Sequence, residues 1–286
     1  MLKTSTIDYM QYSIPEPPDK TVLINPITPQ RFYKFGYQDP NTGIRYYTGN
    51  PKSPKWLVIE SGTALSRLEH MSVIDHARQL QQAGAVFSRI DLAIDCHREE
   101  DDIITVSEIM SWYQEGLIQS KHAKYDAKTV YNAAKANHET LYIGDMSKRG
   151  KKGIFRAYDK GVERGLLPNY VTRFELELKR DDSKLAVRRL QDHTIEQVFA
   201  SKFNIDHERW KQFIDSEPAT LTRDKSQEQE DEQIKLASRW QWLITTIAPS
   251  LGRSIAQDAL HGKLNNYELF NSAVEKAYRE YMQDNA

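Results

Sequence analysis

The chain has 286 residues, a formal net charge of −1 and a single cysteine, Cys96. One cysteine excludes an internal disulfide and every zinc site built from several cysteines. The sequence contains no apolar run long enough to span a membrane and opens on no signal-peptide pattern, so we expect a cytoplasmic protein with one sizeable domain and a small appendage.

The first part of the chain predicts short strands and two helices. Asp39-Pro-Asn-Thr-Gly43 is a hairpin-turn sequence, and residues 56–60 form an apolar run typical of a buried strand. Apolar residues at helical spacing predict a helix over residues 65–82. Thr105-Val-Ser-Glu108 is a capping box, and it predicts a second helix that runs to residue 118.

Three later segments, residues 87–95, 154–160 and 172–179, alternate strictly between charged and apolar residues. A period of two is typical of a β-strand with one buried and one accessible face. The accessible faces are predicted to carry Arg89, Asp91 and Asp95 on the first strand, Arg156, Tyr158 and Lys160 on the second, and Arg173, Glu175, Glu177 and Lys179 on the third. Faces so rich in carboxylates and guanidiniums favour an active site built on a sheet. The alternative interpretation is that these residues form plain cross-strand salt bridges.

The acids on these faces predict a metal site. Carboxylates on neighbouring strands repel one another unless a cation lies between them, and all-oxygen donor sets suit Mg²⁺ or Mn²⁺. We expect Asp91 and Glu175 to be the first metal ligands, with Asp95 and Glu177 as the next candidates.

The tyrosine and the basic residues predict phosphoryl chemistry. Tyr158 is flanked at alternate positions by Arg156 and Lys160, and we expect these cations to lower its pKa and stabilise a phenolate. A phenolate nucleophile, a divalent metal and cations suit phosphodiester transesterification. Arg156, Lys160 and Arg173 are therefore expected to bind the scissile phosphate.

One segment of the chain is rich in basic residues. Residues 148–180 contain ten basic and four acidic residues, although the whole chain is nearly neutral. Such segregation predicts a local DNA-binding patch, with Lys148, Arg149, Lys151 and Lys152 contacting the DNA backbone. A solvated basic hairpin is the alternative.

These motifs also resemble a known family. Glu139-Thr-Leu-Tyr-Ile-Gly144, the run from Arg156 to Gly161 and Arg173-Phe-Glu-Leu-Glu177 resemble the core of the Rep_trans family, which comprises rolling-circle replication initiators of plasmids and phages and related conjugative relaxases. Ser88-Arg-Ile-Asp-Leu-Ala-Ile-Asp95 is similar to a further strand of that family. The chain departs from the family pattern at residues 61–67, which carry two extra residues and no cysteine.

The resemblance implies an architecture related to the HUH nucleases, with carboxylates in place of paired histidines. It points to Tyr158 as the nucleophile, and Tyr142, in its Tyr-Ile-Gly setting, is the alternative. The implied function is a site-specific single-strand DNA endonuclease and strand transferase that starts rolling-circle replication through a covalent 5′-phosphotyrosine. A conjugative relaxase and a non-catalytic DNA-binding regulator are the rival hypotheses.

The predicted fold is α+β, a mostly antiparallel sheet with helices on one face. A helix is expected over residues 183–200, and amphipathic helices over 234–247 and 267–281 predict a small C-terminal helical subdomain. We place the domain boundary between 1–215 and 216–286. The expected partner is origin DNA, single-stranded or extruded as a hairpin. A host helicase and a second copy of the chain are further possible partners. No membrane association is expected.

Overall fold

The computed structural model describes residues 1–16, 18, 25–30, 32–68, 71–99, 102–120, 127–132, 138–148, 153–163 and 170–219. The predicted helices at 234–247 and 267–281 lie outside these residues, as do Arg149, Lys151 and Lys152. The domain boundary between residues 215 and 216 stays a prediction.

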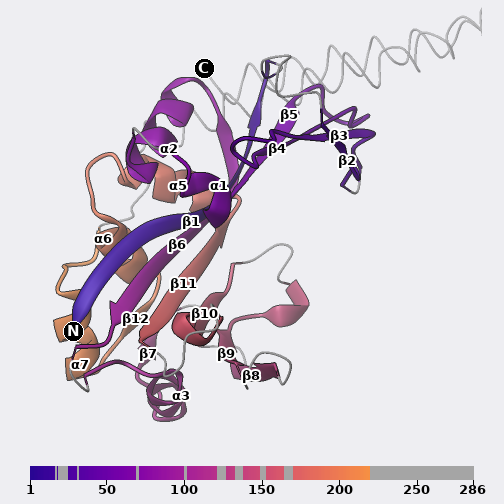
Figure 1. Cartoon of the computed structure of the whole chain (residues 1–286). Coiled ribbons are helices and arrows are strands. Elements are labelled where there is room, and N and C mark those ends of the chain that lie inside the picture. The colour runs from indigo at the N-terminus through magenta and orange to yellow at the C-terminus, as the bar shows by residue number, and fades with distance from the viewer. Residues whose placement is uncertain are drawn as a thin grey trace, which may run out of the picture. The chain divides into compact units, whose positions relative to one another are not determined.

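One ten-stranded sheet forms the frame of the protein (Figure 1). Its strands lie in the order β2-β3-β4-β5-β1-β6-β11-β10-β9-β8, and every pairing between them is antiparallel. The strands are β1 (Leu2–Ile14), β2 (Pro26–Ile27), β3 (Phe35–Gln38), β4 (Arg45–Thr48), β5 (Trp56–Ser61), β6 (Val86–His97), β8 (Ala127–Asn132), β9 (His138–Ile143), β10 (Phe155–Asp159) and β11 (Val171–Lys179). The predicted antiparallel sheet is confirmed.

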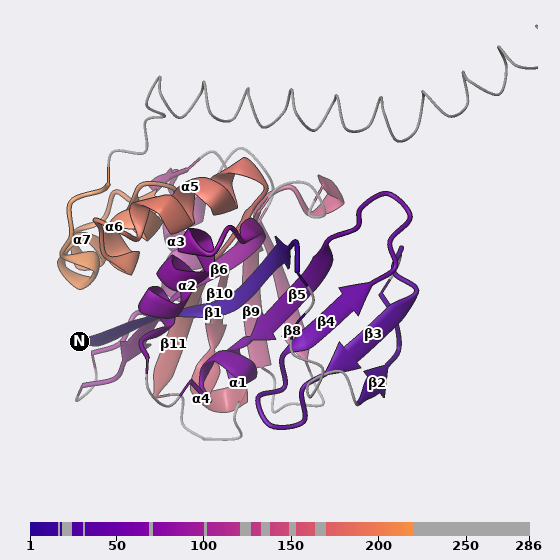
Figure 2. The same cartoon turned by 90° about the horizontal axis from the view of Figure 1, so that it is seen from above.

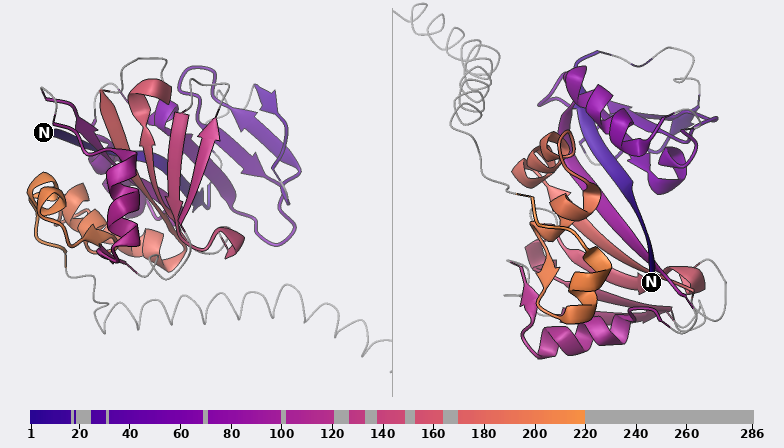
Figure 3. Two further views of the ribbon diagram at one scale, coloured as in Figure 1. Left: turned by 90° about the horizontal axis from the view of Figure 1, so that it is seen from below. Right: turned by 90° about the vertical axis from the view of Figure 1, so that its left-hand side faces the viewer.

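Helices cover one face of this sheet, as Figures 2 and 3 show for the layer around α5, α6 and α7. The helices are α1 (Gly62–Leu65), α2 (Val73–Gln82), α3 (Val106–Gln114), α4 (Lys160–Glu163), α5 (Asp181–Arg189), α6 (Ile195–Ala200) and α7 (Glu208–Ile214). A 3-10 turn (Met146–Lys148) and a two-stranded sheet of β7 (Ile118–Gln119) and β12 (Asn204–Ile205) complete the described elements. None of the described helices is long and apolar enough to cross a membrane.

The core lies between the sheet and the helices because the central strands alternate as predicted. Ile90, Leu92 and Ile94 of β6 are fully buried on the helix-covered face. On β10 the ring of Phe155 stacks on Phe203 with centroids 3.8 Å apart, and on β11 the ring of Phe174 meets Trp210 of α7 edge to face. This packing leaves the charged residues of the same strands on the opposite face, which we call the open face. The prediction that this face is accessible was wrong at its centre, because Asp91, Arg173, Glu175 and Glu177 are buried there by one another's side chains and ion pairs.

Local sequence signals set most of the element ends. The capping box at Thr105 and Glu108 begins α3 as predicted, although α3 ends at Gln114 rather than at residue 118 because Gly116, at φ 76°, turns the chain. In the predicted hairpin turn, the Asp39 carboxylate accepts hydrogen bonds from Asn41 and Thr42.

Two predicted helices are each interrupted. The prediction over 65–82 is wrong in its first part, because α1 ends at Leu65 and Ser72 caps a new helix, α2. The prediction over 183–200 is also wrong as a single helix, because α5 ends at Arg189 and Thr194 opens α6 with its own capping box.

Candidate active site on the open face

The three charge-alternating strands lie side by side, so their charged faces merge. In the register of β10, β11 and β6, Tyr158 is opposite Arg173, which is opposite Asp95. One row along, Arg156 is opposite Glu175, and Glu175 is opposite the small residue Ala93. The sequence therefore predicted which residues share the face, and the pairing of the strands brings them together.

Arg156 lies between two of the predicted metal ligands. Its Nη2 donates to Oε1 of Glu175 and, at 3.2 Å, to Oδ2 of Asp91. Its Nε–H is buried and has no acceptor among the residues that the structure describes. A guanidinium with one donor still unused can accept a further anionic ligand such as a phosphate oxygen.

Arg173 is held from two sides. Its Nε and Nη2 bind both oxygens of Asp95 at 2.6 and 2.7 Å, and its Nη1 binds Oδ1 of Asp8 at 2.5 Å. The side chain is 5% exposed. This pairing joins the guanidinium to Asp95 and Asp8, and the role of Arg173 in phosphate binding stays a prediction.

A second guanidinium closes the other side of the cluster. Arg89 binds both oxygens of Asp91 and lies 2.8 Å from Oε2 of Glu177. Lys179 approaches the other oxygen of Glu177 at 2.8 Å. Each of the four predicted metal ligands is therefore paired with a basic side chain.

Asp8 is the site residue that the sequence argument missed. A β-bulge in β1, between Ile7 and Tyr9 in the pairing with β6, breaks the alternation at this point, and Asp8 reaches Arg173. Asp8 is the only acidic residue of β1, and this was the available signal. Gly62 makes this approach possible, because a Cβ at that position would lie 2.6 Å from Oδ1 of Asp8.

The cluster carries one more acid than bases. The acids are Asp8, Asp91, Asp95, Glu175 and Glu177, and the bases are Arg89, Arg156, Arg173 and Lys179, which gives 4 − 5 = −1 when all are ionised. Burial raises the pKa of Glu175 to about 8, Arg156 opposes the rise, and the charges of Asp91 and Asp8 add to it. A proton or a bound cation can neutralise this excess.

Tyr158 does not have the lowered pKa that its flanking cations predicted. Burial and then the charge of Glu175 raise the pKa of Tyr158, and Arg173 is the cation that opposes them. The prediction was wrong because the ring is 8% exposed. The Tyr158 hydroxyl donates to Oε2 of Glu175 at 3.3 Å, which gives it a proton acceptor instead of a stabilised phenolate.

Lys160 is also placed differently from the prediction. β10 ends at Asp159, so Lys160 is the first residue of α4 and not a strand residue. Its Nζ binds Oε2 of Glu163 at 2.7 Å and lies 5.5 Å from the centroid of the Tyr158 ring. Lys160 thus contacts the ring face of the tyrosine.

Tyr142, the alternative nucleophile, lies one strand further along. It is opposite Arg156 in the pairing of β9 with β10, while Tyr158 is opposite Thr140. Both tyrosines therefore belong to the open face, and Tyr158 is the one bonded to Glu175. Lys148 ends the 3-10 turn that follows β9, and the other three predicted DNA-binding residues fall outside the described residues.

The cluster has the chemistry of a divalent-cation site without its geometry. Buried carboxylate oxygens with an excess negative charge are the donors that Mg²⁺ and Mn²⁺ prefer. Among the described residues, however, no three acidic, histidine or cysteine side chains converge as a metal site. Arg156 contacts both Asp91 and Glu175, so a cation held by these two acids competes with Arg156.

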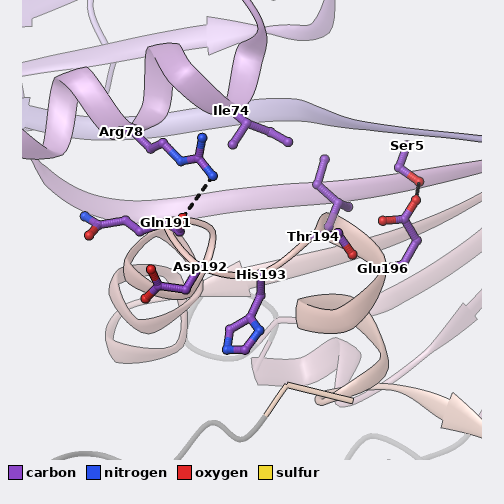
Figure 4. A pocket seen from close by; sticks show the side chains of 9 residues that line it. Ser5, Ile74, Arg78, Gln191, Asp192, His193, Thr194 and Glu196 are labelled. Carbon is purple, nitrogen blue, oxygen red and sulfur yellow. Dashed lines mark hydrogen bonds between the residues drawn. The ribbon is translucent and has the colours of Figure 1, made fainter. Parts of the chain in front are cut away.

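A pocket of about 440 Å³ lies elsewhere, between α2 and the loop before α6 (Figure 4). Its polar groups serve the fold: Arg78 donates to the Leu190 carbonyl at the end of α5, and Glu196 accepts from Ser5. Thr194 caps α6. These hydrogen bonds join elements of the fold, and none of them involves the charged residues of the open face.

Comparisons with known proteins agree with this geometry. The sequence model of the Rep_trans family, described as replication initiation factor, matches residues 85–253, more than half of the chain. The solved structure of a rolling circle replication initiator protein from Geobacillus stearothermophilus superposes with a TM-score of 0.55 at 15% sequence identity, over 77% of this chain and 93% of that one. No curated protein matches the sequence. The matched residues include β6, β10 and β11, and the chain belongs to the Rep_trans family of replication initiation factors.

Proposed function

We propose that this protein nicks and rejoins one DNA strand at a replication origin, with Tyr158 as the nucleophile, and so starts rolling-circle replication. The observation that carries the proposal is the connected set Tyr158, Glu175 and Arg156. The Tyr158 hydroxyl is bonded to one oxygen of Glu175, and Arg156 is bonded to the other. A nucleophile, a proton acceptor and a phosphate-binding cation thereby share one face of the sheet.

The reaction begins with the proton of Tyr158. When Glu175 is ionised, the proton moves to its Oε2, 3.3 Å away, as Oη of Tyr158 forms a bond to the scissile phosphorus. The bond between phosphorus and the 3′ oxygen breaks, and Glu175 returns the proton to that oxygen. The products are a free 3′-hydroxyl and a 5′-phosphotyrosine, and rejoining follows the same steps in reverse.

The cations of the site stabilise the charge that develops on the phosphate. The unused Nε–H of Arg156 is the donor that we assign to a phosphate oxygen. Lys160, next to the Tyr158 ring, is a second cation near the reacting atoms. Lys148, Arg149, Lys151 and Lys152 are proposed to contact the DNA backbone nearby.

We propose that Asp91 and Glu175 hold Mg²⁺ or Mn²⁺, with Asp95 and Glu177 in support. A divalent ion bound there supplies positive charge that polarises the scissile phosphate. Glu175 can serve both purposes with different oxygens, because Oε1 faces Arg156 and Asp91 while Oε2 faces Tyr158.

A nicking assay with adduct mapping tests the proposal. Full-length protein is incubated with supercoiled DNA carrying its origin, and the covalent protein–DNA species is resolved on a denaturing gel. Tyr158→Phe should abolish both the nick and the adduct, while its matched control Tyr142→Phe keeps them. Mass spectrometry should find the nucleotide on Tyr158. A nucleotide on Tyr142 would show that the nucleophile lies on β9 instead of β10. DNA binding with no adduct would favour a non-catalytic regulator.

A further inference from the structure

The open face continues beyond the proposed nicking site towards β3. One row of side chains in the register of the sheet crosses six strands and consists of Lys179, Arg89, Gln11, Ile59, Arg45 and Gln38. With neighbouring strands 4.7–4.9 Å apart, the row is about 24 Å long. Cations and amides therefore form a line from the site to the far side of the sheet.

Arg45 differs from the other two cations of this row. Arg89 and Lys179 are paired with the acids of the site. Arg45, on β4, makes no hydrogen bond and no ion pair with any residue in the described part of the chain. Beneath it, Ile59 is fully buried and joins Tyr47 and Leu57 in an apolar floor. The guanidinium thus lies next to apolar residues in the sheet register and has no counter-ion among the residues that the structure describes.

The segment around Arg45 is basic. Residues 25–68 contain six basic residues, Arg31, Lys34, Arg45, Lys52, Lys55 and Arg67, and only two acids. Both acids are used inside the fold, because Asp39 closes the hairpin turn and Glu60 accepts hydrogen bonds from Tyr12 and His76. No acid of this segment is therefore available on its surface to neutralise Arg45.

Tyr9 connects Arg45 with the nicking site. The Arg89 guanidinium lies 4.2 Å from the centroid of the Tyr9 ring, and the Tyr9 hydroxyl donates to Gln11. Burial raises the pKa of Tyr9, and the charges of Arg89 and Arg45 oppose that rise. Tyr9 thus lies between the guanidinium of β6 and that of β4.

We propose that this row, with Arg45 as its outermost phosphate contact, is a track for the backbone of single-stranded DNA running from the nicking site across β6, β1, β5 and β4. Charge complementarity carries the assignment, because Arg45 is unpaired and a DNA strand brings one negative charge per nucleotide. The amides of Gln11 and Gln38 can hydrogen-bond to the same strand. The inference deepens the proposed function, on which it rests for the identity of the substrate.

A single strand fits this track better than a duplex. The neighbouring row of the open face holds Glu177, Asp91, Tyr9 and Ser61, so it is acidic towards the site. A second phosphate backbone laid beside the first would lie over this row, and none of these four residues is a cation. An unpaired strand needs only one line of cations.

The test measures binding separately from cleavage. Full-length Tyr158→Phe protein, which is unable to cleave under the proposal, is titrated against a fluorescent 20-nucleotide oligothymidine and a matched duplex over a range of KCl concentrations. Arg45→Gln is introduced on this background, with Arg45→Lys as the rescue. Lys184→Gln is the control, since it removes a cation from α5 on the helix-covered face. Thermal unfolding by circular dichroism confirms that each variant is folded.

Arg45→Gln should weaken single-strand binding and reduce the slope of log affinity against log salt by about 0.7, the value for one lost phosphate contact on a single strand. Arg45→Lys should restore most of both, and Lys184→Gln should change neither. Equal binding by Arg45→Gln and Lys184→Gln, no binding of the oligothymidine at all, or an effect on the duplex alone would overturn the proposal. If binding depends on Arg45 but the wild type does not nick DNA, the result would contradict the proposed function and still support the single-strand track.

Discussion

The hydroxyl of Tyr158 donates to Oε2 of Glu175 at 3.3 Å, and both side chains are buried. Neither group of this pair has its ordinary acidity: burial raises the pKa of Glu175 to about 8 and also raises that of Tyr158. Both groups therefore hold their protons to higher pH than usual, and this has a consequence for stability.

Glu175→Gln should change the pH dependence of stability. A carboxyl whose folded pKa is raised from 4.5 to about 8 stabilises the fold fully below pH 4.5, and this contribution is lost as the pH rises through 8. Relative to Glu175→Gln, the wild type should lose up to about 1.4 kcal/mol of unfolding free energy per pH unit within that window. Urea unfolding of both proteins between pH 5 and 9 measures the difference, and parallel curves would contradict the assignment.

Arg156→Gln should tighten the binding of Mn²⁺. The substitution removes the cation that now contacts both Asp91 and Glu175, so the two acids become free to bind an external ion. Isothermal titration calorimetry of the full-length protein provides the affinity, with Asp91→Asn as the variant that should weaken it. If Arg156→Gln binds Mn²⁺ no better than the wild type, the ion does not share these acids with Arg156. The nicking rate of Arg156→Gln should fall in either case, since its phosphate donor is gone.

Arg173 and Asp95 should show strong coupling in a double-mutant cycle. Removing one partner of a buried ion pair costs about 3–5 kcal/mol because the other charge stays buried without its partner. Arg173→Met and Asp95→Asn should each destabilise the protein, and the double variant should lose less than the sum of the two. Additive losses in chemical denaturation would show that the bidentate contact at 2.6 and 2.7 Å contributes little.

Gly62→Ala should destabilise the site through Asp8. The new methyl group would lie 2.6 Å from Oδ1 of Asp8, which must move and loosen its contact with Arg173. We expect a loss of about 1–3 kcal/mol, typical of overpacking. In an Asp8→Ala background the clash is absent, so Gly62→Ala should cost much less there. An equal cost in both backgrounds, measured by urea unfolding, would place the strain elsewhere.

Hydrophobic periodicity predicted the positions of side chains best where a strand has one apolar face. It identified the open-face residues of β6, β10 and β11, because burying Ile90, Leu92 and Ile94 leaves only one orientation for the intervening acids. It could not give Asp8 a partner, since a bulge changes the alternation in β1 and strand order is set by tertiary pairing.

Three further errors came from treating local sequence as if it acted alone. The cations next to Tyr158 predicted a lowered pKa, but the burial of the ring and the proximity of Glu175 have the opposite effect and prevail. The predicted helix over 183–200 ran across the Thr194 capping box, which begins a new helix and was present in the sequence. Lys160 was placed on a strand that ends one residue earlier.

The central position of β1 has a consequence for how the protein folds during synthesis. β1 is the first strand of the chain, yet it pairs with β5 and β6, and Leu2 lies opposite His97. Asp8 and Arg173 are separated by 165 positions. At about 5–20 residues per second, the ribosome makes Arg173 roughly 8–33 seconds after Asp8. Throughout that interval the nascent chain holds an incomplete charge cluster on an unfinished sheet, so the cluster can form only after residue 173 has been made and β11 has docked.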